Sequence, residues 1–255
     1  MQVLKCDLPK TLEELEISLF ADEHIGDPAC DLDHLKARIE HVRTHDNVYA
    51  VLNGDIINNA TKTSVSDTYS ETLNPQGQID LATELFMPIK HKILFSNGGN
   101  HEARTYKKEG IDPGYVIANN LGLGAKYSPV ATLLFIRFGT NDRNRKHLYT
   151  VYATHGSGGG RKEGAKIIRL CDLAAIVDAD VYIHSHTHLP IITKEDFYRV
   201  SFSNSSVAPV TKLFVNTSAN LNYGGYGETM GCKPASKDRP RVFLNGKVKD
   251  AKAML

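Results

Sequence analysis

EISLFADEH, residues 16–24, and VYAVLNGDIINN, residues 48–59, each run from an apolar, β-prone segment directly into polar side chains. The first stretch predicts a strand over Glu16–Ala21 and the second a strand over Val48–Asn53. Between them, apolar residues recur at spacings of three and four and predict a helix over Asp31–Thr44. A strand, a helix and a strand in succession are typical of an α/β layered fold.

The same alternation continues along the chain. Further strands are predicted at Ile93–Ser96, Thr132–Phe138, Leu148–Thr154 and Val181–His184, and further helices at Ile79–Lys90, Gly114–Leu121 and Glu163–Val177. In the last third, the predicted consecutive strands are Pro190–Thr193, Phe197–Phe202 and Lys212–Thr217, which indicates a second sheet packed on the first. Residues 60–78 are polar and rich in turn formers, and we expect them to form a loop inserted into a single domain.

Composition gives the protein no global preference for a charged partner. The 255 residues include 30 basic and 29 acidic side chains, a formal charge of +1, so an anionic substrate must be recognised locally. No signal peptide and no membrane-spanning stretch of about 20 apolar residues is visible, and no membrane partner is expected. The four cysteines are scattered without a Cys-x-x-Cys pair, which favours a cytoplasmic protein. Its size and Met-led start suit a bacterial or bacteriophage source.

Polar side chains follow five of the predicted strands at the point where each strand ends. They are Asp22, His24, Asp55, Asn100, His101, His155, His186 and His188. In open α/β sheets ligand sites form at this edge, so these loops are expected to converge on one pocket. Carboxylate and amide oxygens with imidazole nitrogens suit manganese, iron, zinc, nickel or cobalt. Two such ions that share a carboxylate and a bridging hydroxide can hydrolyse a phosphoester.

The same residues form five ordered motifs that resemble those of the calcineurin-like metallophosphoesterases. The motifs are Asp22-Glu23-His24, Gly54-Asp55-Ile56-Ile57-Asn58, Gly99-Asn100-His101-Glu102, His155-Gly156 and Ser185-His186-Thr187-His188. The resemblance implies one domain of this family over residues 1–255, with a four-layer α/β/β/α sandwich of two mixed sheets flanked by helices.

The resemblance also implies a role for each motif residue. Two divalent metal ions, manganese foremost, would be bound: the first by Asp22, His24 and His188, the second by Asn100, His155 and His186, with Asp55 bridging both. His101 would be the catalytic residue that protonates the leaving oxygen, and such general acid catalysis typically contributes about 10²–10⁴-fold to the rate.

Two positions depart from the family pattern. Ser185 stands where the last motif usually has glycine, a change that is tolerated unless the backbone there requires a positive φ. The residues after Asp55 read IINNAT and lack the aspartate-arginine-glycine run of serine/threonine protein phosphatases. The second departure lowers the expectation of a phosphoprotein substrate.

Residues beside the motifs are candidates for substrate binding. Asn58 could cap a turn, support a ligand or contact substrate. Arg104 could pair with Glu102 or bind the substrate phosphate in a bidentate manner. The glycine-rich stretch 155–162 ends in Lys162 and could bind phosphate or act as a connector, with Lys166 and Arg169 as a local basic face. His184 is interpreted as an ordinary, partly buried histidine.

These observations favour a phosphodiesterase that acts on a nucleotide or a nucleic acid, as a nuclease would. A phosphomonoesterase or protein phosphatase is the enzymatic alternative. A scaffold that kept the fold and lost catalysis is the non-enzymatic alternative, and the intact ligand set argues against it.

Overall fold

Two mixed sheets form the centre of the protein in the computed structural model, which describes residues 1–255 except 63, 65, 66, 159, 161, 230, 235 and the side chain of residue 226. Within the described residues, sheet A has the order β1-β6-β7-β8-β10-β9 and sheet B the order β12-β11-β2-β3-β4-β5. The strands of sheet A are β1 Gln2–Asp7, β6 Ala131–Phe138, β7 His147–Thr154, β8 Val181–His184, β9 Ile191–Ser201 and β10 Ser206–Asn216. Those of sheet B are β2 Glu14–Phe20, β3 Val48–Asn53, β4 Ile93–Asn97, β5 Tyr127–Ser128, β11 Arg241–Asn245 and β12 Ala251–Met254.

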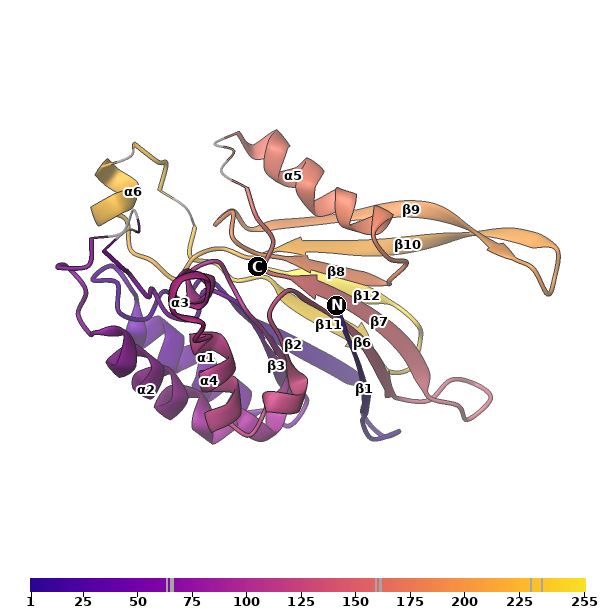
Figure 1. Cartoon of the computed structure of the whole chain (residues 1–255). Helices are drawn as coiled ribbons and strands as arrows, with labels where there is room; N and C mark the ends of the chain where they lie inside the picture. Colours follow the sequence, from indigo (N-terminus) through magenta and orange to yellow (C-terminus); the bar gives the residue numbers. More distant parts are fainter. Residues whose placement is uncertain (63, 65–66, 159, 161, 230, 235) are drawn as a thin grey trace.

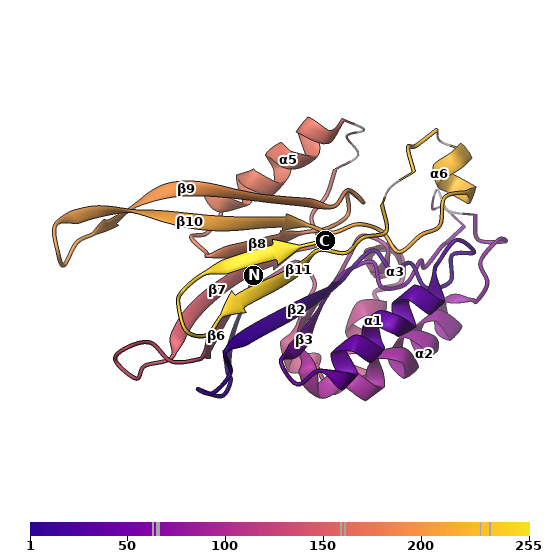
Figure 2. The ribbon, with the colours of Figure 1, turned by 180° about the vertical axis from the view of Figure 1, so that it is seen from behind.

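Helices cover the outer faces of both sheets. The α-helices are α1 Leu32–Thr44, α2 Pro75–Phe86, α3 Glu102–Glu109, α4 Pro113–Asn120, α5 Glu163–Cys171 and α6 Gly225–Thr229, and the 3-10 helices are η1 Met87–Lys92, η2 Gly124–Lys126 and η3 Asp172–Ala175. Helices α1, α2 and α4 lie against sheet B, and α5 lies against sheet A (Figures 1 and 2). The predicted four-layer sandwich is therefore confirmed. No helix among the described residues is long and apolar enough to cross a membrane.

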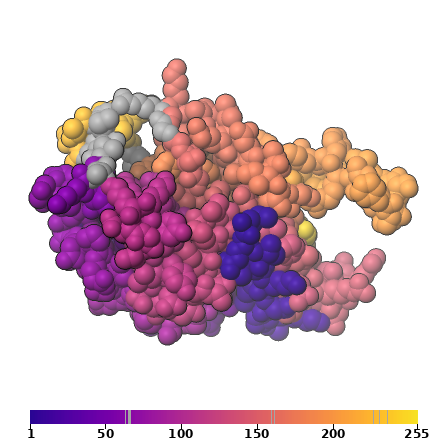
Figure 3. Space-filling model, in the orientation of Figure 1, coloured from indigo at the N-terminus to yellow at the C-terminus, as the bar shows by residue number. Residues whose placement is uncertain are grey.

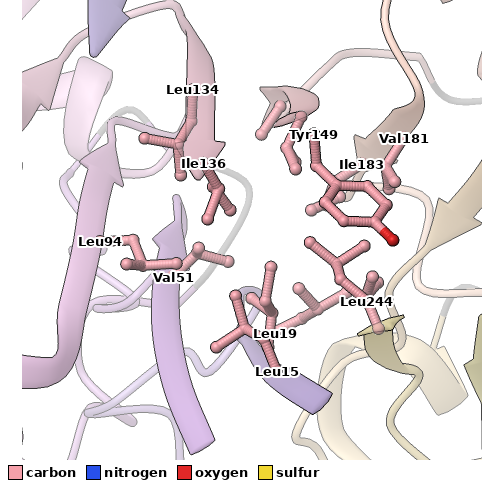
Figure 4. Close-up of a cluster of buried hydrophobic side chains, with 14 of the residues drawn as sticks. Leu15, Leu19, Val51, Leu94, Leu134, Ile136, Tyr149, Val181, Ile183 and Leu244 are labelled. Atoms are coloured by element: carbon pink, nitrogen blue, oxygen red, sulfur yellow. The ribbon is translucent and has the colours of Figure 1, made fainter. Parts of the chain in front are cut away.

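Alternation along the strands builds a core between the sheets. Leu15, Ile17 and Leu19 of β2 are fully buried there and meet residues of sheet A such as Ile183 (Figure 4). Burying each such side chain stabilises the fold by about 1.5–3 kcal/mol. The next residue in the strand, Phe20, points to the opposite face, toward the helices. One strand thus contributes to two cores.

Parallel pairing aligns the carboxyl ends of the strands that precede the motifs. Strands β2, β3 and β4 are parallel to one another in sheet B, and β7, β8 and β10 are parallel in sheet A. Asn97, at the end of β4, joins the two sheets at this edge because its Nδ2 donates to Asn53 Oδ1 at 2.8 Å and to the carbonyl oxygen of Ala153 at 3.0 Å. The motif loops therefore start from one rigid edge.

The C-terminal third differs from the prediction. The segments Pro190–Thr193 and Phe197–Phe202, predicted as two strands, belong to the single strand β9. Its exposed edge position accommodates the intervening charges, which sequence patterning treated as a break. Strands β9 and β10 also extend sheet A instead of forming a separate sheet, and they project from the body as a long ribbon (Figure 3).

Several element boundaries also differ. Helix α2 begins at Pro75, because Asn74 caps its amino end by accepting from Gly77 N, so the predicted loop over residues 60–78 loses its last residues to the helix. Helices α3 and α6 and strands β1, β5, β11 and β12 were not predicted. Of these strands, β1, β5 and β12 lie at the edges of the sheets.

Candidate metal centre

The predicted ligands meet in one place at the carboxyl edge of the sheets. Three overlapping groups have their ligand atoms within 4.8 Å of one another: Asp22, His24 and His188; His24, Asp55 and His101; and Asp55, His155 and His186. Their backbones come from the ends of β2, β3, β4, β7 and β8, as the sequence predicted. Two of the groups match the two implied ion sites.

The distances within each group suit a shared cation. His24 Nε2 and His188 Nε2 face each other at 3.3 Å, and Asp22 Oδ1 lies 3.3 Å from His188 Nε2. On the other side, His155 Nε2 lies 3.1 Å from both Asp55 Oδ2 and Asn100 Oδ1. Oxygen and nitrogen lone pairs that converge in this way form a donor set for divalent ions.

Acceptors behind the ligands orient two of the imidazoles. The Nδ1–H of His155 donates to the carbonyl oxygen of Asn53 at 2.8 Å, and the Nδ1–H of His24 donates to Asn58 Oδ1 at 3.2 Å. Because each acceptor is an oxygen, Nδ1 of each ring carries a proton and Nε2 points into the cluster. This is the usual arrangement around a metal-binding histidine.

Five of the seven predicted ligands have a left-handed backbone. The φ angles are 52° at Asp22, 50° at His24, 51° at Asp55, 65° at His186 and 55° at His188. Such conformations of non-glycine residues cost about 1–3 kcal/mol each and persist at functional sites where the surroundings hold them. Their concentration here supports a functional centre independently of the residue types.

A buried ion-pair network holds the turn after β2. Glu23, between the ligands Asp22 and His24, is fully buried; its Oε1 accepts from Arg38 Nη1 at 2.9 Å and its Oε2 lies 3.5 Å from Arg239 Nη2. Arg239 Nη1 also donates to the carbonyl oxygen of Ala21 at 2.8 Å.

Glu102 ties together the loops after β3 and β4. Its buried carboxylate accepts backbone N–H groups of Asp55 at 3.0 Å, Ile56 at 2.8 Å, Ile57 at 3.3 Å and Gly99 at 2.9 Å. The structure thus places the Glu102 carboxylate on the backbone of both loops. Burial and the neighbouring Asp55 raise the pKa of Glu102 to about 7.

The ligands perturb one another's pKa values. Burial raises the pKa of Asp22 and of Asp55, but the nearby histidines outweigh it and both pKa values are lowered. Burial lowers the pKa of His155, but Asp55 outweighs it and raises the pKa to about 10. A proton is thus held between Asp55 and His155, in the position that a cation would take.

His101, the predicted catalytic residue, lies beside His24 and Asp55. Its Nδ1–H donates to the carbonyl oxygen of Asn58 at 2.6 Å, and its Nε2 lies 3.7 Å from Asp55 Oδ2. Arg104 Nη2 donates to the same Nε2 at 2.9 Å. Burial lowers the pKa of His101, with Asp55 opposing and Arg104 adding to the effect. Arg104 therefore contacts the predicted catalytic residue.

The other two predicted substrate-binding residues, Asn58 and Lys162, lie in different environments. Asn58 is buried, and its carboxamide contacts His24, Asp27 and Glu71. This corresponds to the supporting role. Lys162 is exposed at the amino end of α5.

The glycine-rich stretch is only partly described, because Gly159 and Arg161 lie outside the described residues. Of the predicted basic face, Lys166 Nζ donates to the carbonyl oxygen of Thr187 at 2.7 Å and Arg169 Nη1 to that of Ser157 at 3.3 Å. These contacts hold the loops that carry His155 and His186.

Ser185 fits the position where the family pattern has glycine. It is not among the described residues with positive φ, and its Oγ accepts from Asn53 Nδ2 at 2.8 Å. Its neighbour His184 is buried and its Nδ1 lies 2.7 Å from Asn216 Oδ1, outside the ligand groups.

Sequence reasoning missed two supporting residues. Asn53 binds His155 and Ser185 from the end of β3, and Thr217 Oγ1 donates to Asp22 Oδ2 at 3.1 Å. The available signal was a polar residue at the last position of a buried strand, or directly after one.

Comparisons with known proteins give the following matches. The profile of the calcineurin-like phosphoesterase family matches residues 23–190, about two thirds of the chain. Among solved structures, a metallophosphoesterase from Sphaerobacter thermophilus is 13% identical, with 91% of this chain and 84% of that chain covered and a TM-score of 0.42. A predicted phosphoesterase from Streptococcus pneumoniae TIGR4 is 15% identical, with 94% and 97% covered and a TM-score of 0.35. Vacuolar Protein Sorting 29 from Cryptosporidium parvum is 12% identical, with 95% and 96% covered and a TM-score of 0.44. No curated protein sequence matches.

Proposed function

The chain belongs to the calcineurin-like phosphoesterase family, and from this premise we propose that it is a two-metal phosphodiesterase that acts on a nucleotide or a nucleic acid. Family membership makes phosphoester hydrolysis the reaction class. The observation that carries the proposal is the convergence of seven ligand side chains and His101 at one sheet edge.

The donor set fits two divalent ions. Asp22, His24 and His188 would hold one ion; the second would be held by Asn100, His155 and His186, with Asp55 facing both. When bound, such ions activate water and neutralise charge on the phosphoryl oxygens. Manganese is the expected ion, with iron, zinc, nickel or cobalt as alternatives that the same donors accept.

His101 supplies the proton that the leaving oxygen requires. The carbonyl oxygen of Asn58 fixes its Nδ1–H, so Nε2 is the atom that faces the reacting group. In the structure Arg104 donates to that nitrogen. We propose that Arg104 turns to the substrate phosphate when it binds, since guanidinium and phosphate form paired hydrogen bonds. The freed Nε2 then takes up a proton from solvent and gives it to the leaving oxygen.

The shape of the rim supports a diester substrate. Asn100 is exposed and the side chain of His188 is 37% exposed, whereas Asp22 and Asp55 form a buried floor. An open rim leaves room for a substituent on either side of a phosphate. Lys162 is exposed at the start of α5 and is proposed to bind a neighbouring phosphate of a nucleotide or nucleic acid.

The test is manganese-dependent hydrolysis of a chromogenic phosphodiester beside its phosphomonoester, for the wild type and for His101→Ala. Diester cleavage that is lost in the variant supports the proposal, and a panel of cyclic nucleotides and short oligonucleotides then defines the substrate. Cleavage of the monoester alone would favour the phosphatase alternative. Metal binding without any hydrolysis across the panel would favour the scaffold.

A further inference from the structure

Part of the polar insertion, residues 60–78, packs beside the metal centre. Glu71, which precedes α2, accepts a hydrogen bond from Asn58 Nδ2 at 2.5 Å through its Oε1. The other end of the same carboxamide, Asn58 Oδ1, accepts from His24 Nδ1 at 3.2 Å. A three-residue chain of hydrogen bonds therefore joins the inserted segment to a ligand.

Gln78 fixes the position of Glu71. Gln78 is fully buried; its Oε1 accepts from the backbone N–H of Asn59 at 2.8 Å, and its Nε2 donates to the carbonyl oxygen of Leu73 at 2.8 Å and to Glu71 Oε2. Thr72 N donates to the carbonyl oxygen of Gly26 at 2.9 Å, next to the first motif. Glu71 is thus held in place from both sides.

We propose that Glu71 is a positioning residue for the metal centre, acting through Asn58 to hold the imidazole of His24 with Nε2 toward the ion. This inference rests on the proposed function, because it assumes that His24 ligates a metal. The carboxylate accepts the amide hydrogens of Asn58 and thereby fixes which end of that carboxamide faces the imidazole. Without it the amide is free to rotate and present its NH₂ group, which cannot accept from Nδ1–H.

The expected size of the effect depends on a second carboxylate, that of Asp27, which accepts from the same amide group. Loss of a group behind a metal ligand typically lowers metal affinity about 10–100-fold. Asp27 Oδ2 also accepts from Asn58 Nδ2, at the longer distance of 3.3 Å, and would retain part of the orientation. The expected loss in Glu71→Ala is therefore about tenfold, the lower end of that range.

The first experiment is a calorimetric titration of the metal-free full-length protein with Mn²⁺. Glu71→Ala is expected to weaken one of two binding events about tenfold, while Glu71→Gln, which keeps an acceptor oxygen, recovers part of the loss. The matched control is Glu84→Ala, which removes an exposed carboxylate of α2, and it should bind as the wild type does. Thermal unfolding without metal shows whether each variant is folded.

A double-mutant cycle separates positioning from general damage. If Glu71 acts through Asn58, Glu71→Ala in an Asn58→Ala background causes no further loss of Mn²⁺ affinity. Additive losses in the cycle, or two wild-type affinities in Glu71→Ala, would overturn the inference and leave the proposed function intact. A wild type that binds no Mn²⁺ would overturn the proposed function itself.

Discussion

At the scale of single residues, the proposed function separates the groups that would hold ions from one group that would move a proton. The ligand nitrogens and oxygens converge, and the acceptors behind them, Asn53 and Asn58, only orient. His101 is held by the same Asn58 but lies at the rim. Removing His101 should therefore affect turnover and leave metal binding unchanged.

For His101→Ala we expect kcat on the chromogenic diester to fall about 10²–10⁴-fold, because a positioned proton donor contributes that much. Two Mn²⁺ ions should still bind with unchanged affinity in a titration. A variant that lost an ion would show that His101 is a metal ligand and not the proton donor.

The proposed role of Arg104 in substrate binding can be tested separately from that of His101. Replacing Arg104 with alanine should raise KM about tenfold, since a charge-assisted hydrogen bond to phosphate contributes about 1.5–3 kcal/mol, part of which the proposed phosphate contact of Lys162 would compensate. Arg104→Lys keeps the charge but loses the paired hydrogen bonds, so its KM should lie between those of the wild type and Arg104→Ala. Steady-state kinetics on the diester would measure both. An unchanged KM would indicate that Arg104 contacts His101 but does not bind the substrate phosphate.

At the scale of elements, the turn after β2 depends on a buried ion-pair network. Glu23→Gln keeps the size of the side chain but leaves Arg38 and Arg239 without their carboxylate. Breaking a buried pair from one side typically costs about 3–5 kcal/mol, and urea unfolding of the metal-free protein should show a loss of this size. Glu40→Gln, which breaks an exposed pair with Arg43 on α1, is the control and should not shift the midpoint. Equal effects of the two substitutions would contradict the account.

Helices and strands could be predicted where the periodicity of apolar residues was strong. They were missed where strand formation depended on pairing with another strand. The apolar runs of β2, β3 and β8 predicted these strands. The candidate ligands could then be predicted because they occupy the next positions in the chain. Strand β11 is short and pairs with β2, which is far away in sequence, and β12 pairs in turn with β11. Glu71 was invisible for the same reason: nothing local in the insertion shows that it contacts Asn58.

At the scale of the whole molecule, metal binding and folding are linked, because the donors are brought together only in the folded chain. At a free Mn²⁺ concentration of 100 times Kd, one ion adds about 2.7 kcal/mol to the free energy of unfolding. For a domain of this size we expect Tm to rise by about 5–10 °C, and excess chelator to reverse the rise. A scanning calorimetry series at increasing Mn²⁺ would measure this. A Tm independent of metal would mean that the cluster binds none.

The ribbon formed by β9 and β10 extends away from the candidate metal centre. It projects from the body of the protein (Figure 3). Tyr198 and Phe202 are exposed near the turn between the two strands, and β10 runs from that turn to Asn216, whose neighbour Thr217 contacts Asp22. The turn of the ribbon and the candidate metal centre therefore lie at opposite ends of β10.

The left-handed backbone at the ligands has a consequence for protein engineering. At a residue such as His188, with φ of 55°, glycine is the replacement that the backbone adopts most easily. Random variants selected only for heat resistance in the absence of metal would therefore gain stability by discarding ligands. Selection for robustness alone would tend to erase the chemistry of this protein, so any such campaign has to retain a metal-dependent readout at every round.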